Sequence, residues 1–290
     1  MTLPDLLLAP FADYGFMRRA LVACLALALS AGPVGVLLML RRMSLVGDAM
    51  SHAVLPGAAI GFLIAGSLSL PAMGLGGLVA GLVVAALSGV VSRTTRLRED
   101  ASFASFYLIS LALGVLLVSL RGSSVDLLHV LFGTVLAIDA PALMLVAGIT
   151  TLTLAVLALV YRPLVLECFD PGFLRAVGGR GGLYHMAFMV LVVLNLVAGF
   201  QALGTLMAVG LMMLPAAVAQ LWARTLPGMV TVAACTAALS AYAGLVASFH
   251  LGVASGPAII LAAGVIYGFS LLFGPAGALR HLVAREAPAG

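Results

Sequence analysis

Long runs of apolar residues, separated by short polar connections, recur from one end of the chain to the other. Runs of about 20 apolar residues are long enough to cross a membrane as α-helices. Barrel strands would be shorter and would alternate polar with apolar residues, which this chain does not do. We therefore predict about nine spans (eight to ten), over residues 16–40, 44–68, 71–92, 103–120, 139–161, 184–200, 203–222, 228–249 and 255–274.

The fold expected from this pattern is an all-α, polytopic bundle of transmembrane helices that forms one domain over residues 1–290. Residues 1–15 are predicted to be a short lead-in at the membrane surface. Residues 162–183 form the longest predicted cytoplasmic loop. In the third span, Gly77-x-x-x-Gly81 predicts a close approach of neighbouring helices.

Composition supports this class and sets the orientation. The 290 residues are 63% hydrophobic and 8% charged, whereas roughly a quarter of residues are charged in soluble proteins. All 14 basic residues are arginine, so the chain lacks the lysine of a Walker A phosphate loop. With the amino terminus outside, every arginine except Arg18, Arg19 and Arg121 falls on the cytoplasmic side, as the positive-inside rule requires.

Asp48 is the one acidic residue that lies within a predicted span, and His52 follows it four residues later. Residues four apart share one face of a helix. A carboxylate at this depth costs several kcal/mol if it faces lipid, so it must face protein, water or a cation. Pro56 cannot donate a backbone hydrogen bond and Gly57 follows it, which predicts a loosened backbone beside the pair.

The pair has a structural and a functional interpretation. Asp48 could bond a neighbouring helix or pair with His52 as a structural feature, or both could hold a cation on a translocation path. We favour the path, because ionisable residues inside membranes are functional by default. Two ligands are too few for tight binding, since zinc takes about four, but a conduit must release its ion. A second copy of the chain would complete the ligand set.

Other candidate ligands have weaker support. His129 and His250 lie in segments predicted to face outward, where ordinary surface histidines are expected. The seventh span offers the thioethers of Met207, Met212 and Met213 to a soft metal, although methionine is also common packing material in apolar helices.

The predicted loop over residues 162–183 contains a helix signal. Asp170 can cap a short helix whose first residue is Pro171, and Gly178-Gly179 would end it. This helix is either a solvated connector or a docking site for a cytoplasmic partner.

The sequence from Arg41 to Gly57, RRMSLVGDAMSHAVLPG, resembles the integral-membrane permeases of zinc/manganese/iron ATP-binding-cassette (ABC) importers. Four further segments support the resemblance, which covers nearly the whole chain: residues 98–100, 126–133, 204–217 and 255–259. Residues 250–254 depart from the pattern, because relatives often carry aromatic and acidic residues there.

The resemblance implies a fold similar to the permeases of cobalamin and siderophore importers, and a paired or homodimeric core. It implies two cytoplasmic ABC ATPase subunits and an extracytoplasmic metal-binding protein that docks near residues 126–132. By this likeness Asp48 and His52 contact the transported ion. The segment 170–178 is the helix that couples to the ATPase, with site residues Asp170, Pro171, Gly172, Leu174 and Gly178.

We therefore expect a permease subunit of the cell (inner) membrane with no ATP site, no tightly bound cofactor and no nucleic-acid partner. Zinc is the first expectation for its cargo because of the imidazole, and manganese or iron are alternatives. A stand-alone secondary metal-cation transporter remains the alternative function, although it would need more ionisable groups in its spans. An intramembrane metalloprotease would need a His-Glu-x-x-His helix, and no predicted span contains a glutamate.

Overall fold

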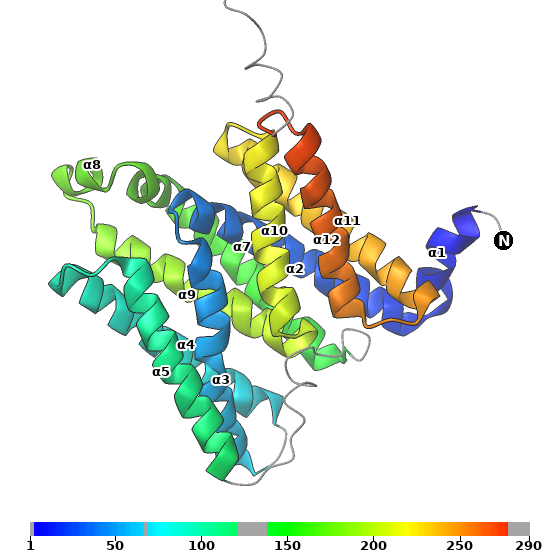
Figure 1. The fold of residues 1–290 in the computed structure, drawn as a ribbon, viewed down its shortest axis with the longest axis horizontal. Coiled ribbons are helices and arrows are strands. Elements are labelled where there is room, and N and C mark those ends of the chain that lie inside the picture. Colours follow the sequence, from blue (N-terminus) through cyan, green and yellow to red (C-terminus); the bar gives the residue numbers. More distant parts are fainter. Residues whose placement is uncertain (1–2, 67–68, 121–137, 278–290) are drawn as a thin grey trace, which may run out of the picture.

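In the computed structural model, residues 3–66, 69–120 and 138–277 are described, and these residues form a bundle of helices (Figure 1). The helices are α1 Leu3–Asp13, α2 Gly15–Leu40, α3 Ser44–Ala65, α4 Leu70–Thr94, α5 Glu99–Leu120, α7 Ala140–Phe169, α8 Pro171–Ala176, α9 Gly181–Leu203, α10 Thr205–Trp222, α11 Leu226–Leu251 and α12 Ser255–Phe273.

Within the described residues, nine helices are long and apolar enough to cross a membrane, namely all of them except α1 and α8. Each lies at a position predicted from the apolar runs, so the predicted all-α membrane bundle is confirmed. Residues 3–13 of the predicted lead-in form α1, which is tied to α11. The hydroxyl of Tyr242 donates a hydrogen bond to the carbonyl of Leu7 (3.0 Å), and its ring stacks on Phe11.

Two local predictions are wrong. First, α7 does not end at residue 161 but continues through Pro163 to Phe169, so residues 162–183 are mostly helical and not one long loop. A proline inside a long helix removes one backbone hydrogen bond, which packed neighbours can compensate. As a consequence, Glu167 lies in the last turn of a helix. Second, Pro56 does not interrupt α3, which remains helical to Ala65.

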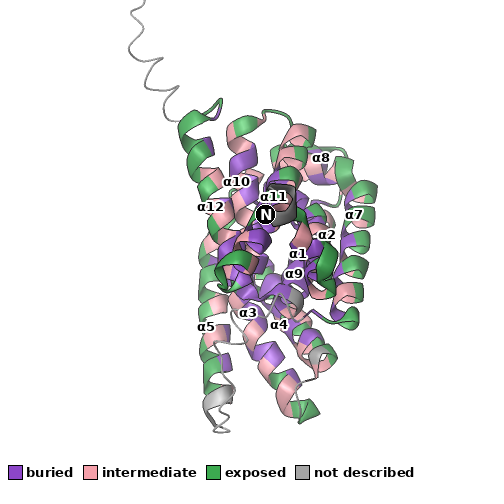
Figure 2. Ribbon diagram, turned by 90° about the vertical axis from the view of Figure 1, so that its right-hand side faces the viewer, coloured by how far each residue is buried: buried purple, intermediate pink, exposed green. Residues whose placement is uncertain are grey.

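The helices divide into a buried centre and an exposed periphery. Helices α2 and α9 bury most of their residues inside the bundle, whereas α5, α7 and α12 bury only a minority of theirs (Figure 2). A helix that is apolar on all sides is typical of a protein surrounded by lipid. The exposed faces of α5, α7 and α12 are therefore the surfaces available to lipid or to other chains.

Two packed groups of helices meet at the centre. Helix α3 packs on α4 and α5, while α10, α11 and α12 pack on one another and, for α10 and α11, on α2. Helix α9 contacts both groups through α3, α4 and α10, and it also packs on α7. In Figure 1 the α3–α5 group extends from the centre on the side away from α12.

Small residues permit the close contact of α3 with α4. The backbone of Gly57 lies against that of Gly76, with no space for a β-carbon on either. Gly77 and Gly81 lie against the side chain of Val54, in agreement with the close approach predicted for Gly77-x-x-x-Gly81. These contacts hold the middle of α3, directly after His52, firmly against α4.

Candidate functional site

A tight turn between α2 and α3 sets the start of the Asp48 helix. Arg42 adopts a left-handed conformation (φ 59°), which is uncommon for a residue with a side chain. The amide of Met43 donates to the carbonyl of Leu38 (2.9 Å), and the amide of Arg42 donates to Met39 (3.0 Å). These two bonds are those of a Schellman motif. Helix α3 therefore begins at Ser44 with its direction set by the backbone.

Asp48 and His52 come together as predicted. The Oδ1 atom of Asp48 lies 3.8 Å from Nε2 of His52, one helical turn away. This distance is too long for a hydrogen bond. Two ligands that each bind one divalent ion at about 2.0–2.2 Å stand roughly 3.0–3.6 Å apart. Small side-chain rotations would therefore allow both atoms to bind the same ion.

The imidazole of His52 is held from one side by α5. Its ring stacks on that of Tyr107, with centroids 6.0 Å apart and planes at 29°. Its Nδ1 atom is buried and has no hydrogen-bond partner among the described residues. A ligating histidine is usually oriented by a hydrogen bond from its second nitrogen. Here the aromatic contact supplies orientation, and Nε2 is the atom directed toward Asp48.

Helix α5 follows the face of α3 that carries His52. The hydroxyl of Ser110 donates to the carbonyl of Ala53 (3.1 Å), and Gly114 lies against the ring of Pro56. Together with Tyr107, these residues recur at intervals of three and four, as expected for one face of a helix. Sequence reasoning missed this face, although its spacing is visible in the sequence once α5 is known to adjoin α3.

The opposite side of the pair is open. In this single chain the Asp48 side chain is 63% exposed and that of His52 is 32% exposed. Leu45 is exposed one turn earlier, and Leu55 and Ala59 are half-buried further along. Their spacing of three and four residues forms a continuous stripe along α3 that the chain covers only in part.

Helix α10 packs on the turn of α3 that carries Asp48. The terminal methyl groups of Met212 and Met213 lie so close to Gly47 that a β-carbon there would displace them. Met207 is buried further along α10. These contacts are packing contacts, and a ligand role for the thioethers stays a prediction. Among the described residues, no group of three or more His, Cys, Asp or Glu side chains is arranged to hold a metal.

The predicted short helix is present as α8. The Oδ1 atom of Asp170 accepts a hydrogen bond from the amide of Phe173 (2.8 Å), and Pro171 is the first helical residue. Gly178 has a positive φ (76°), and the amide of Gly179 donates to Leu174 (2.8 Å). The start and the end predicted from these residues are therefore both found.

One side of α8 is anchored and the other is exposed. The side chain of Leu174 is 4% exposed, so it fixes α8 to the bundle. Phe173 and Val177 are more than half exposed, as is Phe169 just before the helix. Gly172, in the first turn, is exposed as well. Three large apolar side chains spaced four residues apart thus point away from the bundle at this end.

Of the two candidate histidines predicted to face outward, His250 alone lies in the described part of the chain. Residues 126–133, including His129, and the residue His281 lie outside the described part of the chain. His250 is exposed in the last turn of α11, where its ring meets that of Phe249 edge-on. It is not brought near Asp48.

Comparison with known families gives a match over nearly the whole chain. The family described as the ABC 3 transport family matches residues 13–274. The manganese transport system membrane protein MntC of Halalkalibacterium halodurans is 36% identical over 264 residues, which are 91% of this chain and 89% of that protein. The chelated iron transport system membrane protein YfeD of Yersinia pestis is 31% identical, over 93% of this chain and 89% of that protein.

Solved structures share the fold. The structure of PsaBC from Streptococcus pneumoniae in complex with Fab has a TM-score of 0.83 and 30% identity, covering 98% of this chain and 100% of that chain. An inward-facing conformation of a putative metal-chelate type ABC transporter has a TM-score of 0.69 at 17% identity, covering 87% and 84%. The second likeness concerns the fold alone.

Proposed function

The chain belongs to the ABC 3 transport family, and from this premise we propose that it is the permease subunit of a metal-ion importer driven by ATP hydrolysis on partner subunits. The observation that carries the proposal is the Asp48–His52 pair, which stands in an otherwise apolar span with a geometry suited to one divalent ion. The ion is cargo, and the chain holds it only in passage.

Manganese is the first cargo to test, with iron and zinc next. The imidazole alone predicts zinc, but the relatives MntC and YfeD are named for manganese and chelated iron transport. A carboxylate oxygen together with an imidazole nitrogen suits manganese as well as zinc. Selection among these metals rests in part on the extracytoplasmic binding protein that we expect to deliver the ion.

The open stripe on α3 supports a path between two permease copies. A carboxylate that is 63% exposed on a membrane span would face lipid in an isolated chain, at a cost of several kcal/mol. A second copy placed over the stripe would shield Asp48 and contribute its own carboxylate and imidazole. Four ligands would then surround the ion, which is the number that zinc sites use.

Helix α8 supports docking of an ATPase subunit. The exposed side chains of Phe173, in α8, and Val177, just after it, form a small apolar surface on a segment anchored by Leu174. Apolar side chains that project from a fixed helix are suited to insertion into a groove of a partner. We place this end of the bundle on the cytoplasmic side, in keeping with the arginine distribution, and the binding protein at the other end.

The decisive experiment measures uptake of radioactive manganese, iron and zinc into proteoliposomes that contain this chain, its ATPase and its binding protein. Asp48→Asn and His52→Ala should each abolish ATP-dependent uptake while the ATPase stays bound. Leu45→Ile is the matched control, because it keeps an apolar side chain of the same size on the same stripe and has no ligand atom. We expect the control to transport normally.

Two outcomes would contradict the proposal. Undiminished uptake in both site variants would show that the pair is structural. Uptake that persists without ATP or without the ATPase would instead favour a stand-alone secondary transporter.

A further inference from the structure

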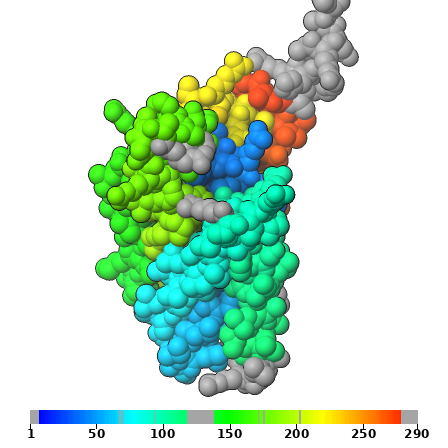
Figure 3. All heavy atoms as spheres, turned by 90° about the vertical axis from the view of Figure 1, so that its left-hand side faces the viewer, coloured from blue at the N-terminus to red at the C-terminus, as the bar shows by residue number. Residues whose placement is uncertain are grey.

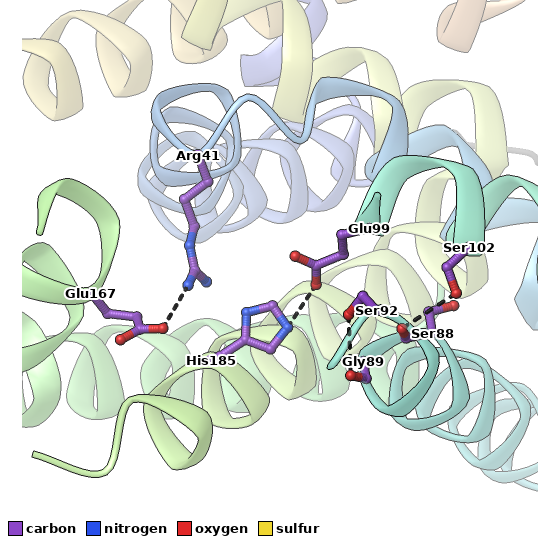
Figure 4. Close-up of polar contacts among 8 residues, drawn as sticks. All are labelled: Arg41, Ser88, Gly89, Ser92, Glu99, Ser102, Glu167 and His185. Atoms are coloured by element: carbon purple, nitrogen blue, oxygen red, sulfur yellow. Dashed lines mark hydrogen bonds and ion pairs between the residues drawn. The ribbon is translucent and has the colours of Figure 1, made fainter. Parts of the chain in front are cut away.

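Two buried ion pairs lie at the end of the bundle that carries α8 (Figure 4). An Nη2 atom of Arg41, at the end of α2, lies 3.7 Å from Oε1 of Glu167 in the last turn of α7. The Nε2 atom of His185, near the start of α9, lies 2.8 Å from Oε1 of Glu99, the first residue of α5. The side chains of Arg41 and His185 are 9% and 7% exposed, so both are withdrawn from solvent.

These pairs flank α8 in the sequence. Glu167 precedes the cap residue Asp170 by three positions, and His185 follows the closing Gly178 by seven. Helix α8 packs on α7 and α9, the two helices that carry Glu167 and His185. A displacement of α8 would therefore first move the end of α7, which carries Glu167, and the start of α9, which carries His185.

The other residue of each pair, Arg41 or Glu99, lies on a segment that continues to the Asp48–His52 site. Arg41 precedes Asp48 by seven residues, and the turn between them has a conformation fixed by backbone hydrogen bonds. Glu99 precedes Tyr107 by eight residues on α5, the helix whose ring stacks on His52. Figure 3 shows the blue segment around the α2–α3 turn set between α8 in green and α5 in blue-green.

The Glu99–His185 contact makes a connection that helix packing alone makes weakly, whereas the Arg41–Glu167 contact adds to the packing of α2 on α7. In the described part of the chain, α5 packs extensively on α3 and α4, and the Glu99–His185 contact joins its first turn to α9. Similarly, α3 packs on α4, α5, α9 and α10, and Arg41 joins the turn at its start to the end of α7. Buried ion pairs are a poor source of stability, because desolvation offsets their attraction.

The Arg41–Glu167 pair is incomplete in this structure. The Nη1 atom of Arg41 and Oε2 of Glu167 are buried, and neither has a hydrogen-bond partner among the described residues. The carboxylate is also confined, because Gly181 at the start of α9 lies directly against it. A bidentate arginine–carboxylate pair would satisfy both atoms. The 3.7 Å contact can close to about 2.8 Å by rotation of the two side chains, by a shift of the end of α7 toward the α2–α3 turn, or by both.

We propose that these two ion pairs couple α8 to the ion path: Arg41–Glu167 transmits its displacement to the Asp48–His52 helix, and His185–Glu99 transmits it to α5. The inference rests on the proposed function, since it assumes that the ATPase docks on α8. We assign the Arg41–Glu167 contact two arrangements, the single, long one of this structure and a bidentate one. A coupling device requires such a two-state element.

The test compares ATP hydrolysis with manganese uptake in proteoliposomes that hold the full complex. Arg41→Gln, Glu167→Gln and Glu99→Gln should retain hydrolysis, while the number of ions moved per ATP falls about fivefold or more, the usual size of a coupling effect. The exchanged pair, Arg41→Glu with Glu167→Arg, should recover a substantial part of that ratio. Controls are Arg42→Gln and Asp100→Asn, because each changes a neighbouring charge that lies outside the two pairs.

Milder variants cover the case in which a glutamine variant does not assemble. Glu167→Asp shortens the acidic side chain, and Arg41→Lys replaces the forked guanidinium with a single ammonium, while both variants keep the two charges. The number of ions moved per ATP should therefore fall while the purified complex stays intact. An unchanged ratio in every assembled variant would overturn the coupling role. So would losses of uptake and hydrolysis that run strictly in parallel. Failure of the proposed function itself would appear differently, as no ATP-dependent uptake by the unsubstituted complex.

Discussion

The imidazole of His52 stacks on the phenol ring of Tyr107 at a centroid distance of 6.0 Å. This contact joins two helices, α3 and α5, at the level of the candidate ion site. It leaves Nε2 of His52 directed toward Asp48, 3.8 Å from the carboxylate oxygen. The orientation of one ligand therefore depends on a residue that has no ligand role itself.

Replacing Tyr107 should weaken ion capture without removing it. Tyr107→Leu removes an aromatic contact of the kind that contributes about 0.5–1.5 kcal/mol, so the manganese concentration for half-maximal uptake should rise about two- to tenfold. Tyr107→Phe retains the ring and is the matched control, with a half-maximal concentration close to that of the natural chain. Uptake kinetics in proteoliposomes measure both. If Tyr107→Leu left the half-maximal manganese concentration unchanged, Tyr107 would have no orienting role.

Gly57→Ala should destabilise the bundle. A β-carbon at Gly57 would collide with the backbone of Gly76, so α3 and α4 would have to separate. Overpacking of this kind costs about 1–3 kcal/mol, and the midpoint of thermal unfolding in detergent should fall accordingly.

The control for this prediction is Gly148→Ala on α7, where a β-carbon would meet no atom within 4 Å. Because alanine favours helices by about 1 kcal/mol over glycine, the control should be neutral or slightly stabilising. Equal midpoints of thermal unfolding for the two alanine variants would show that α3 and α4 can separate to accept the β-carbon at little cost.

The cap of α8 should matter for assembly with the ATPase. Asp170→Ala removes the acceptor for the amide of Phe173, which costs about 1 kcal/mol for a helix cap. The permease should then bind its ATPase about fivefold more weakly, because 1.4 kcal/mol corresponds to tenfold. Titration of the purified ATPase against the detergent-solubilised permease measures this affinity.

Asp170→Asn tests whether the cap or the charge is responsible. Asparagine caps helices as well as aspartate does, so this variant should bind the ATPase normally. Weak binding by Asp170→Asn, equal to that of the alanine variant, would mean that the partner recognises the carboxylate.

A buried hydrogen bond between α7 and α9 should contribute to stability. The amide of Asn195 donates to the hydroxyl of Thr153 (2.9 Å), and both residues are buried. Thr153→Val should lower the free energy of unfolding by about 0.6–1.7 kcal/mol, the range measured for hydrogen bonds between membrane helices. Thr151→Val removes a hydroxyl that bonds only within its own helix at an exposed position, so its effect on thermal unfolding should be smaller.

The features that could be predicted from the sequence are local ones. The nine spans follow from the length of their apolar runs, which a membrane requires regardless of neighbours. The Asp48–His52 pair lies within one turn of one helix, so helical periodicity places both on one face. The limits of α8 depend on Asp170, Pro171 and Gly178, residues whose preferences for helix ends are set by their own backbone chemistry.

Contacts between distant segments could not be predicted in the same way. Nothing near His52 in the sequence indicates Tyr107, and the contact depends on how α5 packs on α3. Glu167 was expected in a loop because Arg162 and Pro163 interrupt the apolar run, yet packing on α9 accompanies a continuation of α7 to Phe169. The ion pair of Glu167 with Arg41 thus became visible only in three dimensions.

A chain that enters the membrane alone carries the exposed carboxylate of Asp48 with it. Helix α3 is also the least apolar of the nine candidate spans in the described residues, with a mean hydropathy of 1.4. An aspartate opposes insertion by up to about 2.5–3.5 kcal/mol, the translocon value for the centre of a helix, and Asp48 lies one turn in from the start of α3. We therefore expect integration of α3 during synthesis to depend on its neighbours α2 and α4, on which it packs.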